Sequence, residues 1–319
     1  MCGIYGFTGF QEPGLRERMD ALLRHRGPDG SGSFVDDRLS MGMRRLAIID
    51  LQTGDQPMFS QDGRWVVCYN GEIYNYLELR DELIAKGHVF HTSSDTEVLV
   101  EAFAEWGIDC LGRLNGMFAF AMYDRRAGDL WLARDRGGQK PLYWWRSGAG
   151  GEPSMAFASE VKALLASRRI PARMDLAAVD PYLALRYVPE PRTMFEGIHT
   201  LPAAHWLHRD PAGEVTVQRY WDIRLTEPGA FERRSDADWL QELEALFEDA
   251  IRLTMRSDVP VAAYLSAGVD SSLIVAAMRR HSDQVHTFSI GFGSAVDETA
   301  HAARTAALVV VSLARSGRA

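Results

Sequence analysis

Two apolar spacings alternate along the first two-thirds of the 319-residue chain. Short apolar runs bounded by turn residues predict strands, and apolar positions three or four residues apart predict helices. Many strands with few helices indicate packed sheets covered by helices. The predicted strands are 4–9, 41–50, 64–69, 117–123, 130–134, 142–145 and 154–158, and the predicted helices are 12–23, 76–85 and 96–106.

The pattern changes after Trp221, where a stretch rich in charged residues, Gly, Pro and Ser shows no apolar period. We therefore expect a first domain over 2–221, a linker over 222–238 and a second domain over 239–319. In the second domain, helix 239–255 should bury an apolar stripe made of Leu240, Leu243, Leu246, Phe247, Ala250 and Ile251. It is followed by strand 261–265, loop 266–270, helix 271–280 and strand 285–290, the β-α-β start of an open parallel sheet.

Composition limits the classes of partner. Hydrophobic residues make up 46% and charged residues 24% of the chain, which is typical of a globular protein. The net charge of −8 argues against nucleic acid or an anionic membrane as the main partner. The sequence shows no secretory signal and no apolar run of membrane-spanning length. Three cysteines form neither a disulfide framework nor a zinc pattern, so we expect a cytoplasmic protein with Cys68 and Cys110 in its core.

The remaining cysteine, Cys2, can carry chemistry because removal of Met1 would give it a free α-amino group beside its thiol. A thiolate is a good nucleophile, and an α-amine with a reference pKa of about 7.7–8.0 is suited to take its proton. The alternative is an incidental cysteine near a frayed terminus. Position alone leaves both interpretations open.

Three further features suit a substrate with an amide and an α-amino acid group. The Asn70 amide and the Gly71 N–H can form an oxyanion hole, although Asn-Gly is also a common turn pair. Arg45 can bind a carboxylate with two hydrogen bonds, or it can be an ordinary surface arginine. Asp95 precedes a predicted helix, where it can cap the helix or bind an ammonium group.

The second domain contains the loop Ser266-Ala267-Gly268-Val269-Asp270-Ser271-Ser272 between a strand and a helix. Gly268 permits close approach of a ligand, and the helix start favours phosphate. Asp270 can hold Mg²⁺ beside that phosphate. The alternative is an ordinary turn with serine caps. The string resembles the pyrophosphate-binding loop of ATP pyrophosphatases, and it implies an ATP site formed by Leu265, Ser266, Gly268, Asp270, Ser271, Ser272 and Ile290.

Taken together, the motifs of the first domain resemble class II glutamine amidotransferases. Joined to the second loop, they resemble the glutamine-hydrolysing asparagine synthetase family. The strings that carry the resemblance are Met1-Cys2-Gly3-Ile4, 24–30, 45–50, Asn70-Gly71-Glu72-Ile73-Tyr74-Asn75, 94–97, 116–120, 134–136, 140–143 and 157–160. The resemblance implies an α+β N-terminal-nucleophile glutaminase domain of α-β-β-α layers. It also implies a partial α/β doubly wound ATP-pyrophosphatase domain.

The resemblance also implies a mechanism. Cys2 attacks the side-chain amide of glutamine, and Asn70 and Gly71 hold the oxyanion. The released ammonia reacts with β-aspartyl-AMP made from aspartate and ATP with Mg²⁺, and no prosthetic group takes part. The residues implied to bind glutamine are Arg45, Ile48, Ile49, Asn70, Gly71, Glu72 and Asp95.

The sequence departs from the family at three places. Ala267 stands where the loop usually has Gly. Gly138-Gln139 departs from a pattern that commonly has an aromatic or apolar residue on either side of the glycine. The familial pattern stops near residue 303. Only two strands of the second domain are predicted. We therefore expect a truncated and aggregation-prone chain that lacks much of the synthetase site. The alternatives are a natural short form completed by a partner chain or forming a homodimer, an inert remnant, and an amidotransferase of secondary metabolism with another carboxylate acceptor. An amidotransferase that makes glucosamine phosphate would lack the 266–272 loop.

Overall fold

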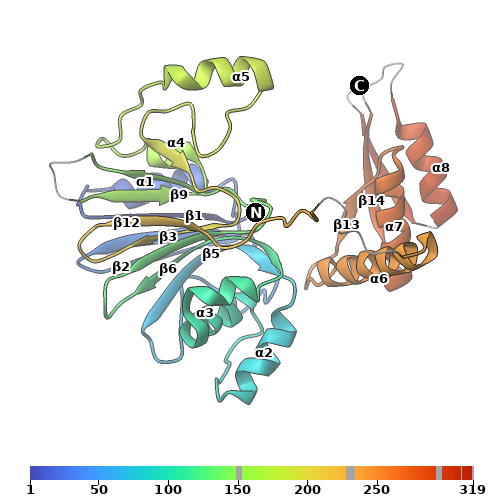
Figure 1. Ribbon diagram of the computed structural model, residues 1–319, viewed down its shortest axis with the longest axis horizontal. Helices are drawn as coiled ribbons and strands as arrows, with labels where there is room; N and C mark the ends of the chain where they lie inside the picture. Colours follow the sequence, from blue (N-terminus) through green and yellow to red (C-terminus); the bar gives the residue numbers. More distant parts are fainter. Residues whose placement is uncertain (149–152, 228–233, 292–296, 310, 318–319) are drawn as a thin grey trace. The chain divides into compact units, whose positions relative to one another are not determined.

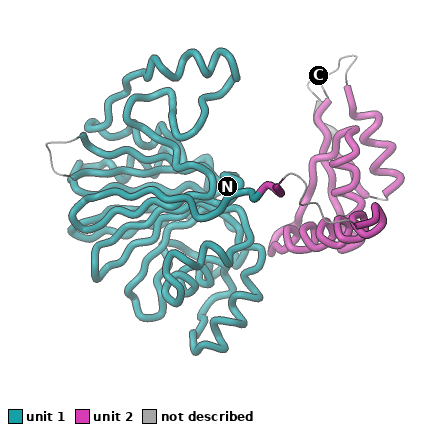
Figure 2. The backbone as a smooth tube through the Cα atoms, viewed as in Figure 1, with its two compact units in different colours: residues 1–224 teal, residues 225–319 magenta. Residues whose placement is uncertain are grey.

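The computed structural model describes residues 1–148, 153–227, 234–291, 297–309 and 311–317. These residues form two compact units, 1–224 and 225–319 (Figure 2). Among the described residues, no helix combines the length and the apolar character needed to cross a bilayer.

Unit 1 contains two six-stranded sheets in which every neighbouring pair of strands is antiparallel. The first sheet has the order β10-β8-β9-β1-β3-β2, with β1 (Gly3–Thr8), β2 (Gly30–Val35), β3 (Leu39–Arg45), β8 (Tyr143–Arg146), β9 (Met155–Ala158) and β10 (Ile198–Thr200). The second has the order β12-β11-β7-β6-β5-β4, with β4 (Met58–Phe59), β5 (Trp65–Ile73), β6 (Gly116–Asp124), β7 (Leu130–Arg134), β11 (His205–Arg209) and β12 (Val215–Arg219).

Helices cover the outer faces of both sheets (Figure 1). The first sheet packs against α1 (Leu15–Leu23) and α4 (Val161–Leu164), and the second packs against α2 (Tyr76–Ala85) and α3 (Asp95–Trp106). A third apolar cluster fills the space between the sheets and includes Cys68, while Cys110 is buried beneath α3. These four layers confirm the predicted α-β-β-α fold. The other helices among the described residues of unit 1 are α5 (Val179–Leu185) and two 3-10 helices, Gly107–Gly112 and Leu176–Ala178.

The elements that end near the proposed site differ from their predictions. The strand predicted over 41–50 ends at Arg45, and residues 46–50 leave the sheet as a loop in which Asp50 has a φ of 53°. The strand predicted over 64–69 continues to Ile73. Both changes bring loop and strand residues toward Cys2, which precedes β1.

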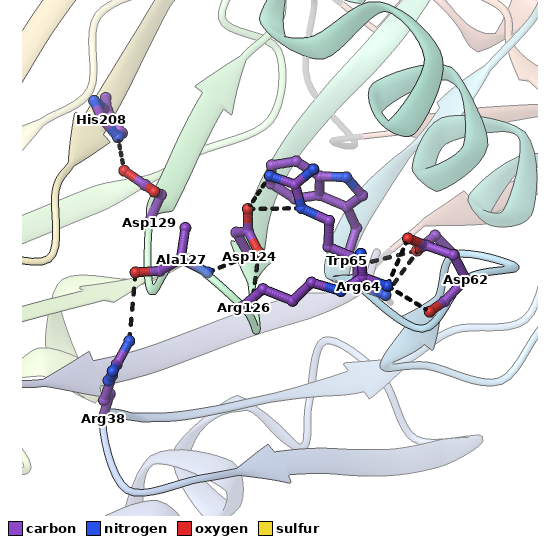
Figure 3. Close-up of polar contacts among 10 residues, drawn as sticks. Arg38, Asp62, Arg64, Trp65, Asp124, Arg126, Ala127, Asp129 and His208 are labelled. Carbon is purple, nitrogen blue, oxygen red and sulfur yellow. Dashed lines mark hydrogen bonds and ion pairs between the residues drawn. The ribbon is translucent and has the colours of Figure 1, made fainter.

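A buried carboxylate fixes the turn between β6 and β7 (Figure 3). Asp124 Oδ2 accepts hydrogen bonds from Arg64 Nε at 2.9 Å and Nη2 at 2.6 Å, and Oδ1 accepts from the N–H groups of Arg126 and Ala127. Burial acts to raise the pKa of Asp124, but the Arg64 guanidinium and the two N–H donors outweigh it and lower the pKa. Asp124 therefore joins the start of β5 to the turn between β6 and β7.

The described residues of unit 2 form three parallel strands in the order β13-β14-β15. Its elements are α6 (Asp236–Thr254), β13 (Ala262–Tyr264), α7 (Val269–His281), β14 (His286–Gly291), α8 (Thr299–Val309) and β15 (Ser312–Gly317). The count of two predicted strands was therefore wrong by one, because β15 lies beyond the familial pattern. Helix α6 begins three residues before its predicted start, since Ser235 and Asp238 form a reciprocal capping box.

The prediction that α6 buries its apolar stripe was wrong for four of the six residues, while Phe247 and Ile251 are half-buried. Leu240, Leu243 and Leu246 are 62–64% exposed, and Ala250 is exposed as well. Among the described residues, the small core of unit 2 contacts α6 near its C-terminal end, through Ile251 and Met255. A three-stranded sheet leaves too little apolar surface among the described residues of this unit to cover the rest of the helix.

Candidate active site

Cys2 is half-buried, and its side chain and its backbone each accept a hydrogen bond from another part of unit 1. Its Sγ accepts a hydrogen bond from the Leu46 N–H at 3.3 Å, and its carbonyl accepts one from Arg26 Nε at 2.9 Å. Arg26 in turn forms an ion pair with Glu160 at 3.0 Å. Burial raises the pKa of the Cys2 thiol, and the Leu46 N–H and the positive chain terminus offset this only in part. The resting side chain is thus a thiol that needs a base before it can attack.

A small pocket beside Cys2 collects residues from β3, β5, α3 and the loop after β3. Its volume is about 20 Å³, about the space that one water molecule requires. A substrate the size of an amino acid therefore requires the lining side chains to move. The pocket brings together seven residues proposed for catalysis or glutamine binding: Cys2, Arg45, Ile48, Ile49, Gly71, Glu72 and Asp95.

Asn70 and Gly71 lie inside β5, so the turn interpretation of this pair was wrong, as was its placement after a strand. They pair with Ala119 and Phe118 of β6. A Cβ at Gly71 would come within 2.3 Å of the Met117 carbonyl oxygen, which explains the need for glycine. The Asn70 Nδ2 is buried and has no hydrogen-bond partner among the described residues. Since an unsatisfied buried donor is costly, this amide is suited to a substrate oxygen.

Arg45 is buried at the end of β3, which contradicts the surface-arginine interpretation. Its guanidinium donates to Asp55 Oδ1 at 3.1 Å and to the carbonyl oxygens of Ile49 at 3.3 Å and Asp50 at 2.5 Å. A Cβ at Gly54 would lie 2.4 Å from Nη2. The loop after β3 therefore closes against the guanidinium.

Asp95 is the first residue of α3, and Ser94 takes the cap position by accepting from the Thr96 N–H. The capping interpretation of Asp95 was therefore wrong. Asp95 Oδ2 instead accepts from the Tyr69 hydroxyl at 2.8 Å and from the Ile73 N–H at 3.0 Å. Burial raises the pKa of Asp95 to about 6, although these donors act in the opposite direction.

Tyr69 and Lys140 belong to this region, although the sequence had assigned them no role. Tyr69 lies next to the Asn-Gly pair, and Lys140 lies inside one of the familial strings. Lys140 is buried, and burial lowers its pKa while the charges of Glu72 and Cys2 act to raise it. Its loop is held by the buried carboxylate of Asp135, which accepts from the backbone N–H groups of Phe118, Gly137, Gln139 and Lys140. The backbone that carries Lys140 is therefore fixed, and the lysine lies near enough to the thiol for their charges to interact.

The loop of unit 2 is closed on itself by serine side chains. Ser266 Oγ lies 2.9 Å from Ser271 Oγ and accepts from the Gly268 N–H at 3.1 Å, while Ser272 Oγ donates to the Gly268 carbonyl at 2.8 Å. Helix α7 begins at Val269, so the prediction that Ser271 starts it was wrong by two residues. The Ala267 N–H donates to Glu298 at 3.1 Å, so a carboxylate already engages one of the loop amides.

The other residues proposed for ATP are distributed around this loop. Leu265 is buried and directly follows β13, whereas Ile290 of β14 is 56% exposed. Asp270 is exposed in the first turn of α7. No group of three or more metal-binding side chains occurs among the described residues. Asp270 alone therefore suits Mg²⁺ only where phosphate oxygens supply further ligands, which is the usual arrangement for this ion.

Curated relatives are similar to the chain over nearly its whole length. Asparagine synthetase [glutamine-hydrolyzing] 3 of Bacillus subtilis is 38% identical over 307 residues, which cover 92% of this chain and 48% of the relative. A putative asparagine synthetase [glutamine-hydrolyzing] 2 of Methanocaldococcus jannaschii is 35% identical over 326 residues, which cover 94% of this chain and 61% of the relative. The chain thus spans about half the length of the curated relatives it matches.

One solved structure supports the fold. A glutamine phosphoribosylpyrophosphate amidotransferase from B. subtilis, complexed with ADP and GMP, matches with a TM-score of 0.50 and 17% identity, covering 98% of this chain and 65% of that one. The asparagine synthase family model matches residues 242–312. The glutamine amidotransferase domain model matches residues 1–221. The chain therefore belongs to the glutamine amidotransferase domain family, and it joins that domain to part of an asparagine synthase domain.

Proposed function

We propose that unit 1 hydrolyses glutamine to glutamate and ammonia, with Cys2 as the nucleophile. One observation carries this proposal: the small pocket beside the Cys2 thiol is lined by a buried arginine and two carboxylates, Arg45, Glu72 and Asp95. A free amino acid presents a carboxylate and an ammonium group, and these side chains have the complementary charges. The unsatisfied Asn70 amide supplies a donor for the side-chain oxygen.

In the proposed reaction, the α-amine of a processed Cys2 takes the thiol proton, and Sγ attacks the amide carbon of glutamine. The carbonyl oxygen becomes an oxyanion that accepts from Asn70 Nδ2 and the Gly71 N–H. The amine returns the proton to the leaving nitrogen, ammonia departs, and a thioester remains. Water attacks the thioester with the amine as base, which releases glutamate and restores the thiol. Since the thiol must stay reduced, we place the reaction in the cytoplasm.

We further propose that the ammonia serves an ATP-dependent amidation of aspartate to asparagine. The asparagine synthase match in unit 2 and the names of the relatives support this proposal. ATP would contact 265–272 and Ile290, with Glu298 giving up the Ala267 N–H to phosphate, and Asp270 would bind Mg²⁺ together with the phosphates. The ion would neutralise phosphate charge. The exposed stripe of α6 favours either a completing synthetase chain or a second copy as a partner.

Glutamate release from glutamine by the purified chain tests the first proposal. We expect turnover that is lost in Cys2→Ala and kept in Cys110→Ala, which changes a cysteine buried in the core beneath α3. Turnover that survives in Cys2→Ala would contradict the assignment. N-terminal mass analysis checks that Met1 has been removed, because the mechanism needs the Cys2 amine. A separate assay tests the second proposal: with ammonia supplied, we expect no asparagine from aspartate and ATP by this chain alone, and asparagine once a completing synthetase chain is added.

A further inference from the structure

Asp95 is held in the pocket by an uncharged residue, Tyr69. The Tyr69 hydroxyl, on β5, donates to Asp95 Oδ2 at 2.8 Å across 26 positions of sequence. The Ile73 N–H donates to the same oxygen at 3.0 Å. The backbone N–H groups of Thr96 and Asp95 also donate to this carboxylate, so the Tyr69 hydroxyl is the side-chain member of a set of donors that holds it.

The tyrosine is itself fixed in place. Its ring is buried, and its backbone N–H donates to Gln56 Oε1 at 2.7 Å. Gln56 Nε2 then donates to Thr96 Oγ1 at 3.3 Å, on the same helix as Asp95. Two paths, one through the ring and one through the backbone, thus join β5 to the start of α3. The hydroxyl has little freedom to leave the carboxylate.

From this geometry we infer that Tyr69 is a positioning residue that orients Asp95 and favours its charged form for an ammonium ligand. The inference rests on the proposed glutaminase function for the identity of that ligand. A hydroxyl that donates to a carboxylate stabilises the ionised state. Burial raises the pKa of Tyr69 well above its ordinary value, so the hydroxyl keeps its proton and remains a donor at neutral pH.

Other ionisable groups surround the pocket, so the contribution of Tyr69 must be separated from theirs. Glu72 and Cys2 lie close enough to Asp95 or Tyr69 to influence their protonation. Arg45 lines the pocket, and Lys140 interacts with the charges of Glu72 and Cys2. On α3 itself, Glu97 is occupied by the N–H groups of His91 and Thr92. None of these groups is altered when the Tyr69 hydroxyl alone is removed.

The test is a pH titration of the Asp95 carboxyl carbon by NMR on the full chain, with the signal assigned from its loss in Asp95→Asn. In Tyr69→Phe we expect the titration midpoint to rise by about one pH unit, the scale of one lost bond to a charged group. Tyr5→Phe is the matched control, because Tyr5 is equally buried, lies in β1 of the other sheet, and donates its hydroxyl to Asp20 of α1 at 3.4 Å. The control should leave the Asp95 midpoint unchanged.

A second variant covers the case in which Tyr69→Phe fails to fold. Site-specific 3-fluorotyrosine at position 69 keeps the hydroxyl and replaces one ring hydrogen with fluorine, which makes the hydroxyl a stronger donor, so the Asp95 midpoint should fall. A midpoint that does not move in either variant overturns the inference, whether or not the chain hydrolyses glutamine.

Kinetics then distinguish the inference from the proposed function. In Tyr69→Phe, the KM for glutamine should rise several-fold near pH 6.5 and return toward the wild-type value near pH 8.5, while kcat changes little. A KM that is raised by the same factor at every pH would overturn the inference and would leave the glutaminase function unaffected. If Tyr69→Phe shifts the Asp95 midpoint but the wild-type chain shows no glutamine turnover, the positioning role is supported and the proposed function is overturned.

Discussion

Replacing Gly71 with alanine tests the packing that places the proposed oxyanion hole. The added Cβ would lie 2.3 Å from the Met117 carbonyl oxygen and 2.7 Å from Phe118 Cα, both backbone atoms of β6. Reaching an acceptable contact of 3.0 Å requires β5 and β6 to separate by about 0.7 Å at this point. Overpacking of this kind costs about 1–3 kcal/mol. The Gly71 N–H and the Asn70 amide move with the strand, and a displacement approaching 1 Å can lower a rate about 100-fold.

Two measurements check this expectation. Urea denaturation should show Gly71→Ala to be less stable by about 1–3 kcal/mol, and glutamate release should fall about 100-fold in kcat. Gly112→Ala is the matched control, because a Cβ at Gly112 meets nothing within 4 Å. The control should stay within about 0.5 kcal/mol of the wild type and keep its turnover. A Gly71→Ala chain with wild-type stability and wild-type kcat would refute the close approach of β5 to β6.

Three further predictions concern charged groups. Asp124→Asn should lower the free energy of unfolding by about 1–3 kcal/mol at pH 7. Because the folded pKa of Asp124 is lowered, this difference should shrink as the pH falls below about 3.9, as urea denaturation at pH 7 and pH 3 would show. In the wild type, the KM for glutamine should rise as the pH falls through about 6, because protonated Asp95 loses its attraction for an ammonium group. Lys140→Met should slow iodoacetamide alkylation of Cys2, read by mass spectrometry against Cys68, because a positive charge that favours the thiolate is removed.

Much of unit 1 follows from the spacing of apolar residues. The strand 130–134 and the helix 76–85 were confirmed at both ends, because each is bounded by polar or turn residues and buries one regular face. At Asn70-Gly71 the local sequence was misleading, because this turn-type dipeptide lies inside β5. Asn-Gly favours a turn locally, but pairing with β6 over nine positions outweighs that preference. Local sequence therefore predicted the residue types of the site better than their backbone conformation.

The contacts of the site itself depend on residues that are far apart in the sequence. Tyr69 meets Asp95 across 26 positions, and Leu46 meets Cys2 across 44. No local spacing encodes such pairs, because the strands and the start of α3 bring them together only after the sheet has formed. The motifs could suggest which side chains bind a substrate, whereas the hydroxyl that holds Asp95 became visible only in the folded chain.

The stripe of α6 shows that a correct pattern can still give a wrong burial. Leu240, Leu243 and Leu246 repeat at helical spacing, and α6 is helical there, so the periodicity predicted the element correctly. Periodicity identifies the apolar face of a helix, but burial of that face also requires an apolar surface to pack against it. The core of unit 2 provides that surface only near Ile251 and Met255. An apolar helix face without a cover favours association, so the same three leucines that defined the helix in the sequence are the first residues to examine for contact with a partner chain.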